Sequence, residues 1–137
     1  MELTMRRVDD AYRFETITPT GFALHTDASQ DIGGNNTGPR PMEMVLTAMV
    51  SCSSIDVVYL LNKQRQKIDD LQVDVKAERA ETAPRVFTSI HLHYRLKGDL
   101  DEKKVERACR LSMEKMCSVS LMLKGTVDIT WSYSVEA

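Results

Sequence analysis

With 137 residues, of which 42% are hydrophobic and 28% charged, the chain has the size and composition of one globular domain, residues 1–137. Its 18 lysines and arginines nearly balance its 20 aspartates and glutamates, and the formal net charge of -2 disfavours nucleic acid as a partner. Three cysteines exclude a fully paired disulfide framework within one chain.

The opening residues, Met1 to Asp10, carry charge early and contain no apolar stretch of signal-peptide length. We therefore expect a reducing, cytoplasmic location. In such a compartment a disulfide is more often a catalytic or sensing intermediate than a structural bond.

A β meander is predicted for the beginning of the chain. Two short runs, residues 13–18 and 21–26, are separated by the turn sequence Thr18-Pro19-Thr20-Gly21. Residues 29–40 are then rich in Gly, Asn, Asp and Pro, which indicates a loop rather than a domain boundary.

A long helix is predicted from Pro41 to about Lys63, because proline suits the first helical turn and cations suit the C-terminus. The segment from Met42 to Leu61 is long enough to cross a bilayer. Glu43 and Asp56 within it would be costly in lipid. We therefore predict a buried core helix and no membrane partner.

Alternating apolar and polar residues predict two strands, 71–77 and 86–96, that form a hairpin. A second helix is predicted to begin at Asp99, since Glu102 three positions later completes a capping-box pattern. Its inner stripe would consist of Val105, Cys109, Ser112 and Met116.

The last predicted elements are a short segment, 118–123, closed by Gly125 near its C-cap, and an amphipathic strand, 127–135. The order of elements is meander, helix, hairpin, helix and strand. This order predicts an α+β fold rather than a parallel α/β sheet.

The three cysteines have different contexts. Cys52 lies midway along the apolar helix, where a small buried hydrophobe and a reactive thiol are about equally compatible with the sequence. Cys117 precedes a new helix start, where the helix dipole favours a thiolate. Cys109 lies on the inner stripe of the second helix, which indicates a packing role.

Cys109 cannot easily pair with Cys117. A separation of eight residues corresponds to a rise of about 12 Å along a helix, whereas a disulfide requires Cα atoms roughly 4.4–6.8 Å apart. Cys52 with Cys117 is therefore the one redox couple expected within a folded subunit.

The stretches Gly38 to Leu46, Cys52 to Val58 and Glu114 to Val119 resemble the OsmC/Ohr family, especially its YhfA-like branch, and the similarity covers nearly the whole chain. The resemblance implies an OsmC-like intertwined homodimer in which antiparallel β-sheets wrap around two central helices. It also implies that Cys52 is the peroxidatic cysteine and Cys117 the resolving one. The Cys52 sulfenic acid would condense with Cys117, and a dithiol reductant would reopen the disulfide.

The groups that would activate Cys52 match the family less well. The resemblance implies an arginine held by a glutamate ten residues before the first cysteine, and that position is Met42 here. Glu43 is the candidate catalytic carboxylate, but nine steps of about 100° put it on the opposite side of the helix from Cys52. Its alternative role is to complement the helix dipole.

The activating cation is not assigned by the sequence. Arg13, Arg40 and Arg85 are candidates, and each is also compatible with an ordinary surface charge. Asp56 shares the helix face of Cys52, so it either anchors a cation or raises the pKa of the thiol and lowers its reactivity.

No cofactor and no metal site are predicted. His91 and His93 share the polar face of one strand, but His25 is too distant in sequence to be taken as a third ligand. Gly33-Gly34 lacks the spacing and the lysine of a phosphate-binding loop.

The predicted function is that of a thiol-dependent peroxidase, an antioxidant enzyme that reduces small organic hydroperoxides in a pocket lined by Met42, Met49 and Met116. Two alternatives stay open: a non-enzymatic small-molecule-binding protein of the same fold, and a redox sensor that oxidises but turns over slowly. A homodimer is expected in each case, because one small subunit does not easily cover a nearly all-apolar helix.

Overall fold

A computed structural model describes residues 1–137, which form two compact units, residues 1–47 and 48–137. Helix α1 (Pro41–Lys63) begins in the first unit and continues into the second. The expected single domain of residues 1–137 stays a prediction.

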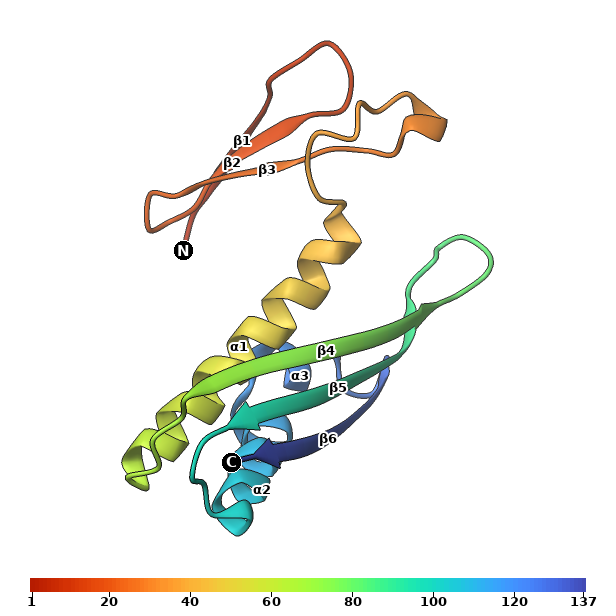
Figure 1. The fold of residues 1–137 in the computed structure, drawn as a ribbon. Coiled ribbons are helices and arrows are strands. Elements are labelled where there is room, and N and C mark those ends of the chain that lie inside the picture. The colour runs from red at the N-terminus through yellow and green to blue at the C-terminus, as the bar shows by residue number, and fades with distance from the viewer. The chain divides into compact units, whose positions relative to one another are not determined.

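The first unit contains a three-stranded antiparallel sheet in the order β1-β2-β3 (Figure 1). Its strands are β1 (Thr4–Arg7), β2 (Phe14–Ile17) and β3 (Ala23–Thr26). The turn between β2 and β3 is closed by Gly21 N–H, which donates to Thr18 O at 2.9 Å. Gly21 has a φ of 93°, which only glycine adopts readily. The predicted meander is confirmed, and β1 is an additional strand.

The polar loop after β3 folds around one buried carboxylate. Asp27 accepts hydrogen bonds from the Thr37 hydroxyl at 2.6 Å, from Thr37 N–H at 3.0 Å and from Ala28 N–H at 2.7 Å. These donors, the Thr37 hydroxyl first, lower the pKa of Asp27 to about 2. A 3₁₀ turn, η1 (Gln30–Ile32), lies within this loop.

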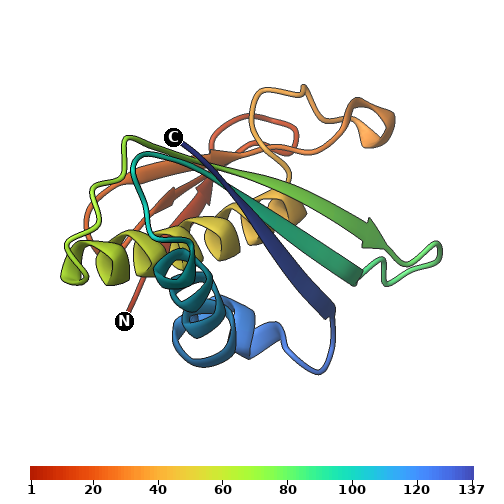
Figure 2. The same cartoon turned by 60° about the horizontal axis from the view of Figure 1, so that its bottom comes forward.

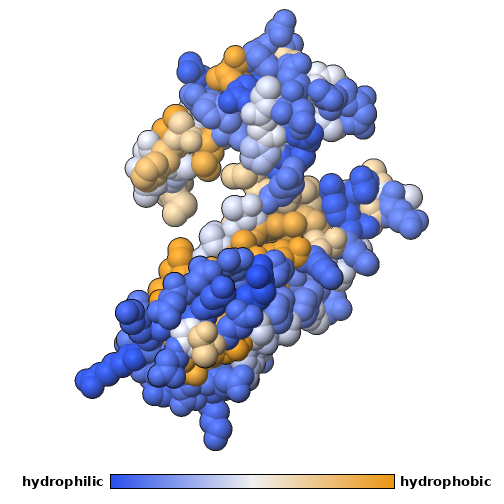
Figure 3. Space-filling view, in the orientation of Figure 1, coloured by the Kyte–Doolittle hydropathy of each residue, from blue (hydrophilic) through white to orange (hydrophobic).

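Helix α1 has the predicted bounds, but one chain buries only a single stripe of it. The buried stripe consists of residues spaced four apart along the helix, namely Met49, Ser53, Val57 and Leu61. Ile55 is 69% exposed and Tyr59 is 53% exposed, and apolar patches reach the surface along α1 (orange in Figure 3). The expected core helix is therefore only partly covered within one subunit.

By length and composition, α1 is the one helix of the chain that could cross a membrane. Only 22% of its most apolar window is buried. A helix that packs against a second subunit meets the same criteria, so this observation alone favours neither environment.

The second unit contains a three-stranded sheet in the order β4-β5-β6. Its strands are β4 (Asp70–Arg79), β5 (Phe87–Lys97) and β6 (Asp128–Glu136). β4 and β5 form the predicted antiparallel hairpin, whereas β5 and β6 are parallel, so the expectation of purely antiparallel sheets is wrong at this pair. The helical connection between β5 and β6 returns the chain to the end of the sheet where β5 begins, which makes the pairing parallel. The α+β class is confirmed.

The helices of this unit lie on one face of its sheet (Figures 1 and 2). They are the second part of α1, α2 (Glu102–Leu111), a π-helical turn η2 (Ser112–Met116) and α3 (Ser118–Leu123). β5 directs alternate residues toward this helical layer, and those residues are buried: Ile90, Leu92, Tyr94 and Leu96. The unit thus has two layers, with its core between sheet and helices.

Helix α2 begins two residues later than predicted. Its N-cap is Asp101, whose carboxylate accepts hydrogen bonds from Lys103 N–H at 2.9 Å and Lys104 N–H at 3.4 Å. Asp99 cannot take this role, because it lies in the turn between Gly98 and Leu100, where Leu100 N–H donates to Gly98 O.

The π turn η2 changes which residues of the second helical segment face inward. Cys117 N–H donates to Ser112 O at 2.7 Å, a bond that spans five residues instead of four. The extra residue turns Met113 inward, where it is 7% exposed, and turns Met116 outward, where it is 37% exposed. The predicted inner stripe is correct for Val105, Cys109 and Ser112 and wrong for Met116.

Candidate functional site

The structure brings Cys52 and Cys117 together. Cys52 is half-buried on α1, and Cys117 is fully buried at the N-cap of α3. The Cys117 Sγ lies 3.8 Å from the backbone oxygen of Met49, three residues before Cys52 on α1. A hydrogen bond with the Cys52 thiol is one of the interactions that raise the pKa of Cys117. Both thiols are free, and they are neighbours in the fold.

Cys117 occupies a buried but polar environment. Burial is the main cause that raises the pKa of its thiol. Ser120 opposes this effect, since its hydroxyl lies 3.2 Å from Sγ, within hydrogen-bonding distance, and its backbone N–H donates to Sγ at 3.4 Å. Ser120 itself is 2% exposed. Sequence reasoning missed Ser120, although the Cys-x-x-Ser spacing at a helix start is typical of residues that meet across an N-cap.

A cluster of buried hydroxyls joins α1 to the π turn. The Ser53 hydroxyl forms hydrogen bonds with the Tyr94 hydroxyl and, at 2.8 Å, with the Ser112 hydroxyl. All three residues are fully buried. Ser112 also accepts the backbone hydrogen bond of Cys117, so the cluster fixes the backbone of Cys117 relative to the turn of α1 that carries Cys52.

Tyr94 is held in its neutral form within this cluster. Burial raises the pKa of its hydroxyl, while the hydrogen bond with Ser53 acts in the opposite direction. A protonated tyrosine hydroxyl can donate to Ser53. Sequence reasoning placed Tyr94 and Ser112 on apolar stripes and gave neither of them a polar role.

Asp56 lies at the edge of the hydroxyl cluster. Its Oδ2 accepts a hydrogen bond from the Ser112 hydroxyl at 3.0 Å, and it forms no salt bridge. Within this chain, Asp56 therefore does not anchor a cation, which was the first of its two predicted roles. Asp56 instead helps to hold the π turn against α1.

Glu43 forms a cap at the start of α1. Its Oε1 accepts a hydrogen bond from Arg40 N–H at 3.0 Å, and Arg40 O begins the helical hydrogen bonds by accepting from Met44 N–H. This geometry is half of a capping box. It supplies the helix-start role that the sequence offered as the alternative, and a catalytic role for Glu43 stays a prediction.

The three candidate arginines each donate to a backbone oxygen of a loop. Arg13 donates to Thr37 O at 2.6 Å, and Arg85 donates to Ala80 O at 3.2 Å. Arg40 donates to Gly38 O at 3.0 Å and to the Asn36 side chain at 2.7 Å. These contacts assign none of the three guanidinium groups to Cys52.

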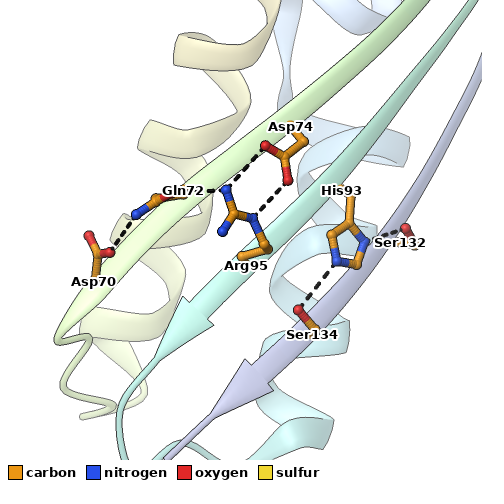
Figure 4. A network of polar contacts seen from close by, with 7 residues as sticks. All are labelled: Asp70, Gln72, Asp74, His93, Arg95, Ser132 and Ser134. Atoms are coloured by element: carbon orange, nitrogen blue, oxygen red, sulfur yellow. Dashed lines mark hydrogen bonds and ion pairs between the residues drawn. The ribbon is translucent and has the colours of Figure 1, made fainter.

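The histidines of β5 lie on the outer, polar face of the sheet and are held by hydroxyl groups. His93 bonds Ser132 at 2.7 Å and Ser134 at 3.2 Å (Figure 4). His91 bonds Thr130 at 2.7 Å and Ser132 at 3.0 Å. Beside them, Arg95 pairs with Asp74 at 2.7 Å (Figure 4). No group of three or more His, Cys, Asp or Glu residues in the chain is arranged to hold a metal ion.

A cavity of about 300 Å³ lies between η2, α3 and the beginning of β6. It is lined by Met113, Glu114, Ser120, Lys124, Val127, Asp128, Ile129 and Trp131. None of the three methionines expected to line a pocket lies here. Met49 is instead fully buried in α1's inner stripe.

Comparison with known proteins shows the family to which the chain is similar. The family model described as "OsmC-like protein" matches residues 33–132. Protein YhfA of Escherichia coli strain K12 is 51% identical over 108 residues, which cover 78% of this chain and 81% of that protein.

Two solved structures have similar folds. A hypothetical protein from Aquifex aeolicus VF5 is 32% identical with a TM-score of 0.86, over 98% of this chain and 95% of that one. An organic hydroperoxide resistance protein OsmC from Legionella pneumophila is 19% identical with a TM-score of 0.71, over 98% of this chain and 97% of that one. At this low identity the Legionella protein supports the fold alone.

Proposed function

The chain belongs to the OsmC-like protein family, and from that premise we propose that it reduces small organic hydroperoxides with the thiol pair Cys52 and Cys117. One observation carries the proposal: the thiol of Cys117 at the start of α3 lies against α1 beside Cys52. The Legionella protein that shares this fold is described as an organic hydroperoxide resistance protein, and we propose the same class of substrate for this chain.

The different exposure of the two thiols suggests their order of reaction. Cys52 is half-buried, so solvent and a small peroxide can reach part of its side chain, whereas Cys117 is fully buried and can meet only Cys52. The Cys52 thiolate attacks one peroxide oxygen, the O–O bond breaks, and an alcohol leaves after taking up a proton. The resulting sulfenic acid is then converted to the Cys52–Cys117 disulfide, and a dithiol reductant restores both thiols.

The site is proposed to work in a homodimer. In one subunit the outward face of α1 carries Ile55, Val58 and Tyr59 around a shallow hollow of about 440 Å³. A second copy of α1 would bring an apolar surface of the same kind to this face. The expected subunit count is two by light scattering, and Ile55→Lys should yield monomers. A monomeric wild type would refute this part of the proposal.

The enzymatic part is tested by mixing the reduced protein with one equivalent of an organic hydroperoxide and measuring its mass. We expect a loss of two hydrogens in the wild type. Cys117→Ser should instead gain one oxygen on Cys52, and Cys52→Ser should not change.

Excess dithiol separates the competing functions. Continuous peroxide consumption supports an enzyme, and a single oxidation without turnover indicates a redox sensor. A wild type that neither changes mass nor consumes peroxide would reject both and leave a binding protein of the same fold.

A further inference from the structure

The Ser120 hydroxyl lies between two sulfur atoms. It is 3.2 Å from Cys117 Sγ and 3.7 Å from Met113 Sδ, in a site where Ser120 is almost fully buried. A hydroxyl has one hydrogen, so it can donate to only one of these sulfurs at a time. Its choice depends on which sulfur is the better acceptor.

Deprotonation of Cys117 changes that choice. A neutral thiol is a weak acceptor, and its own S–H can donate to Met49 O at 3.8 Å while the Ser120 hydroxyl donates to Met113. A thiolate is a strong acceptor, because hydrogen bonds to a charged group are roughly twice as strong as neutral ones. The Ser120 hydroxyl and backbone N–H would then both donate to Cys117.

We propose that Ser120 is a positioning residue for the resolving step, with a hydroxyl that turns from Met113 Sδ to Cys117 Sγ when Cys117 loses its proton. The proposal rests on the peroxidase function proposed above. It explains how a fully buried thiol can become a nucleophile, since fixed donors replace the water that burial removes.

Ser120 assists the closure of the Cys52–Cys117 disulfide. The Cys117 thiolate attacks the sulfur of the Cys52 sulfenic acid, the S–S bond forms, and the S–O bond breaks. The departing hydroxide combines with the proton that Cys117 released, which gives one water. The organic hydroperoxide supplies the oxidising equivalents.

Few other titratable groups face the Cys117 thiol. Cys52 faces it from α1, and Tyr94 acts on it from β5, where burial keeps the tyrosine protonated. Asp56 of α1 bonds Ser112 rather than the thiol. Glu114 and Lys115 of the π turn are exposed. The pH dependence of the resolving step should therefore report mainly on Cys117.

The test follows the two half-reactions separately by rapid mixing with an organic hydroperoxide. In Ser120→Ala, sulfenic acid formation on Cys52 should stay within about twofold of wild type, because the Ser120 hydroxyl hydrogen-bonds only Cys117 and Met113. Disulfide formation should be about tenfold slower at neutral pH, and its pH midpoint should rise by about one unit. Ser120→Thr keeps the hydroxyl and should keep the wild-type midpoint.

Ser118→Ala is the matched control, since Ser118 is exposed on the same helix. It should leave both half-reactions unchanged. An unchanged pH midpoint in Ser120→Ala would overturn the proposal while the peroxidase stands. The same slowing in Ser120→Ala and Ser120→Thr, with lower melting temperatures in both, would overturn it in favour of packing. Absence of any sulfenic acid in the wild type would instead refute the peroxidase itself.

Discussion

Cys109 and Cys117 are both fully buried and lie eight residues apart, yet their surroundings differ. Around Cys109, burial raises the pKa of the thiol to about 12, the nearby Glu106 adds to the effect, and no side chain donates to the sulfur. Around Cys117, burial also raises the pKa of the thiol, but two donors from Ser120 oppose this effect. Although solvent reaches neither thiol, the donors around the two sulfurs differ, and such donors favour a thiolate at Cys117 over Cys109.

The backbone explains why donors from other residues reach only one of the two thiols. Cys109 lies inside α2, where every neighbouring N–H is used by the helix. Cys117 lies between the π turn and α3, where the first N–H groups of the new helix have no helical partner. A break in the helix therefore supplies the hydrogen bonds that an unbroken helix cannot.

The largest effect expected from this comparison is the complete presence or complete absence of a disulfide. After oxidation with an organic hydroperoxide, Cys109→Ala should form the Cys52–Cys117 disulfide as fully as wild type, and Cys117→Ala should form no disulfide at all. Peptide mapping by mass spectrometry locates the bond. A disulfide that contains Cys109 would break the comparison.

The second effect concerns stability in alkali. Burial raises the pKa of Cys109 from an ordinary value of 9.0 to about 12 in the folded state. The stability that depends on its neutral thiol is therefore fully present below pH 9 and is lost between pH 9 and 12. Over that interval the wild type should lose roughly 4 kcal/mol more free energy of unfolding than Cys109→Ala. Urea titrations at several pH values measure this difference, and parallel curves would contradict the assigned environment.

A smaller effect is expected from the hydroxyl cluster on the Cys117 side. Ser112→Ala leaves Ser53 and Asp56 without one hydrogen-bond partner each, which should lower the free energy of unfolding by about 1–3 kcal/mol. Urea unfolding at neutral pH measures this loss, with Ser118→Ala as the control. If Ser112→Ala also abolished the loss of stability between pH 9 and 12 that is assigned to Cys109, the surroundings of Cys109 and Cys117 would not be independent.

The smallest effect lies at the acid end of the pH range, to which neither thiol contributes. Asp27 has a pKa of about 2 in the fold, so its contribution is complete above its ordinary value of 3.8 and is lost as pH falls through 2. Between pH 4 and 2 the melting temperature of wild type should therefore fall more than that of Asp27→Asn. Equal falls would show that the bonds to Thr37 do not stabilise the carboxylate.

Local patterns predicted most of the fold. The bounds of α1 followed from Pro41 and the cations after Leu61, and the hairpin followed from strict alternation. The errors lie where two local choices compete. Asp99 and Asp101 are both suitable caps, and only the turn at Gly98 selects Asp101. The parallel β5–β6 pair could not be predicted, because strand pairing depends on the path of the helical connection.

The candidate site was predicted in part. The pairing of Cys52 with Cys117 was expected, and the structure brings the two residues together. The supporting residues were missed because their contacts join distant parts of the chain. Ser53 and Ser112 are 59 residues apart, and nothing in the local sequence of either indicates a buried polar partner. The π turn, which moves Met116 outward, has no sequence pattern of its own.

The parallel pairing of β5 with β6 also bears on the kinetics of folding. Every residue pair in this ladder is separated by 39 positions, from Ser89 with Asp128 to Lys97 with Glu136. The β4–β5 hairpin can form by local search, but β6 can dock only after the whole helical connection is in place, and such non-local contacts slow folding. A nascent or refolding chain would therefore pass through a stage with a formed hairpin and three accessible thiols. That stage is the one most exposed to incorrect oxidation.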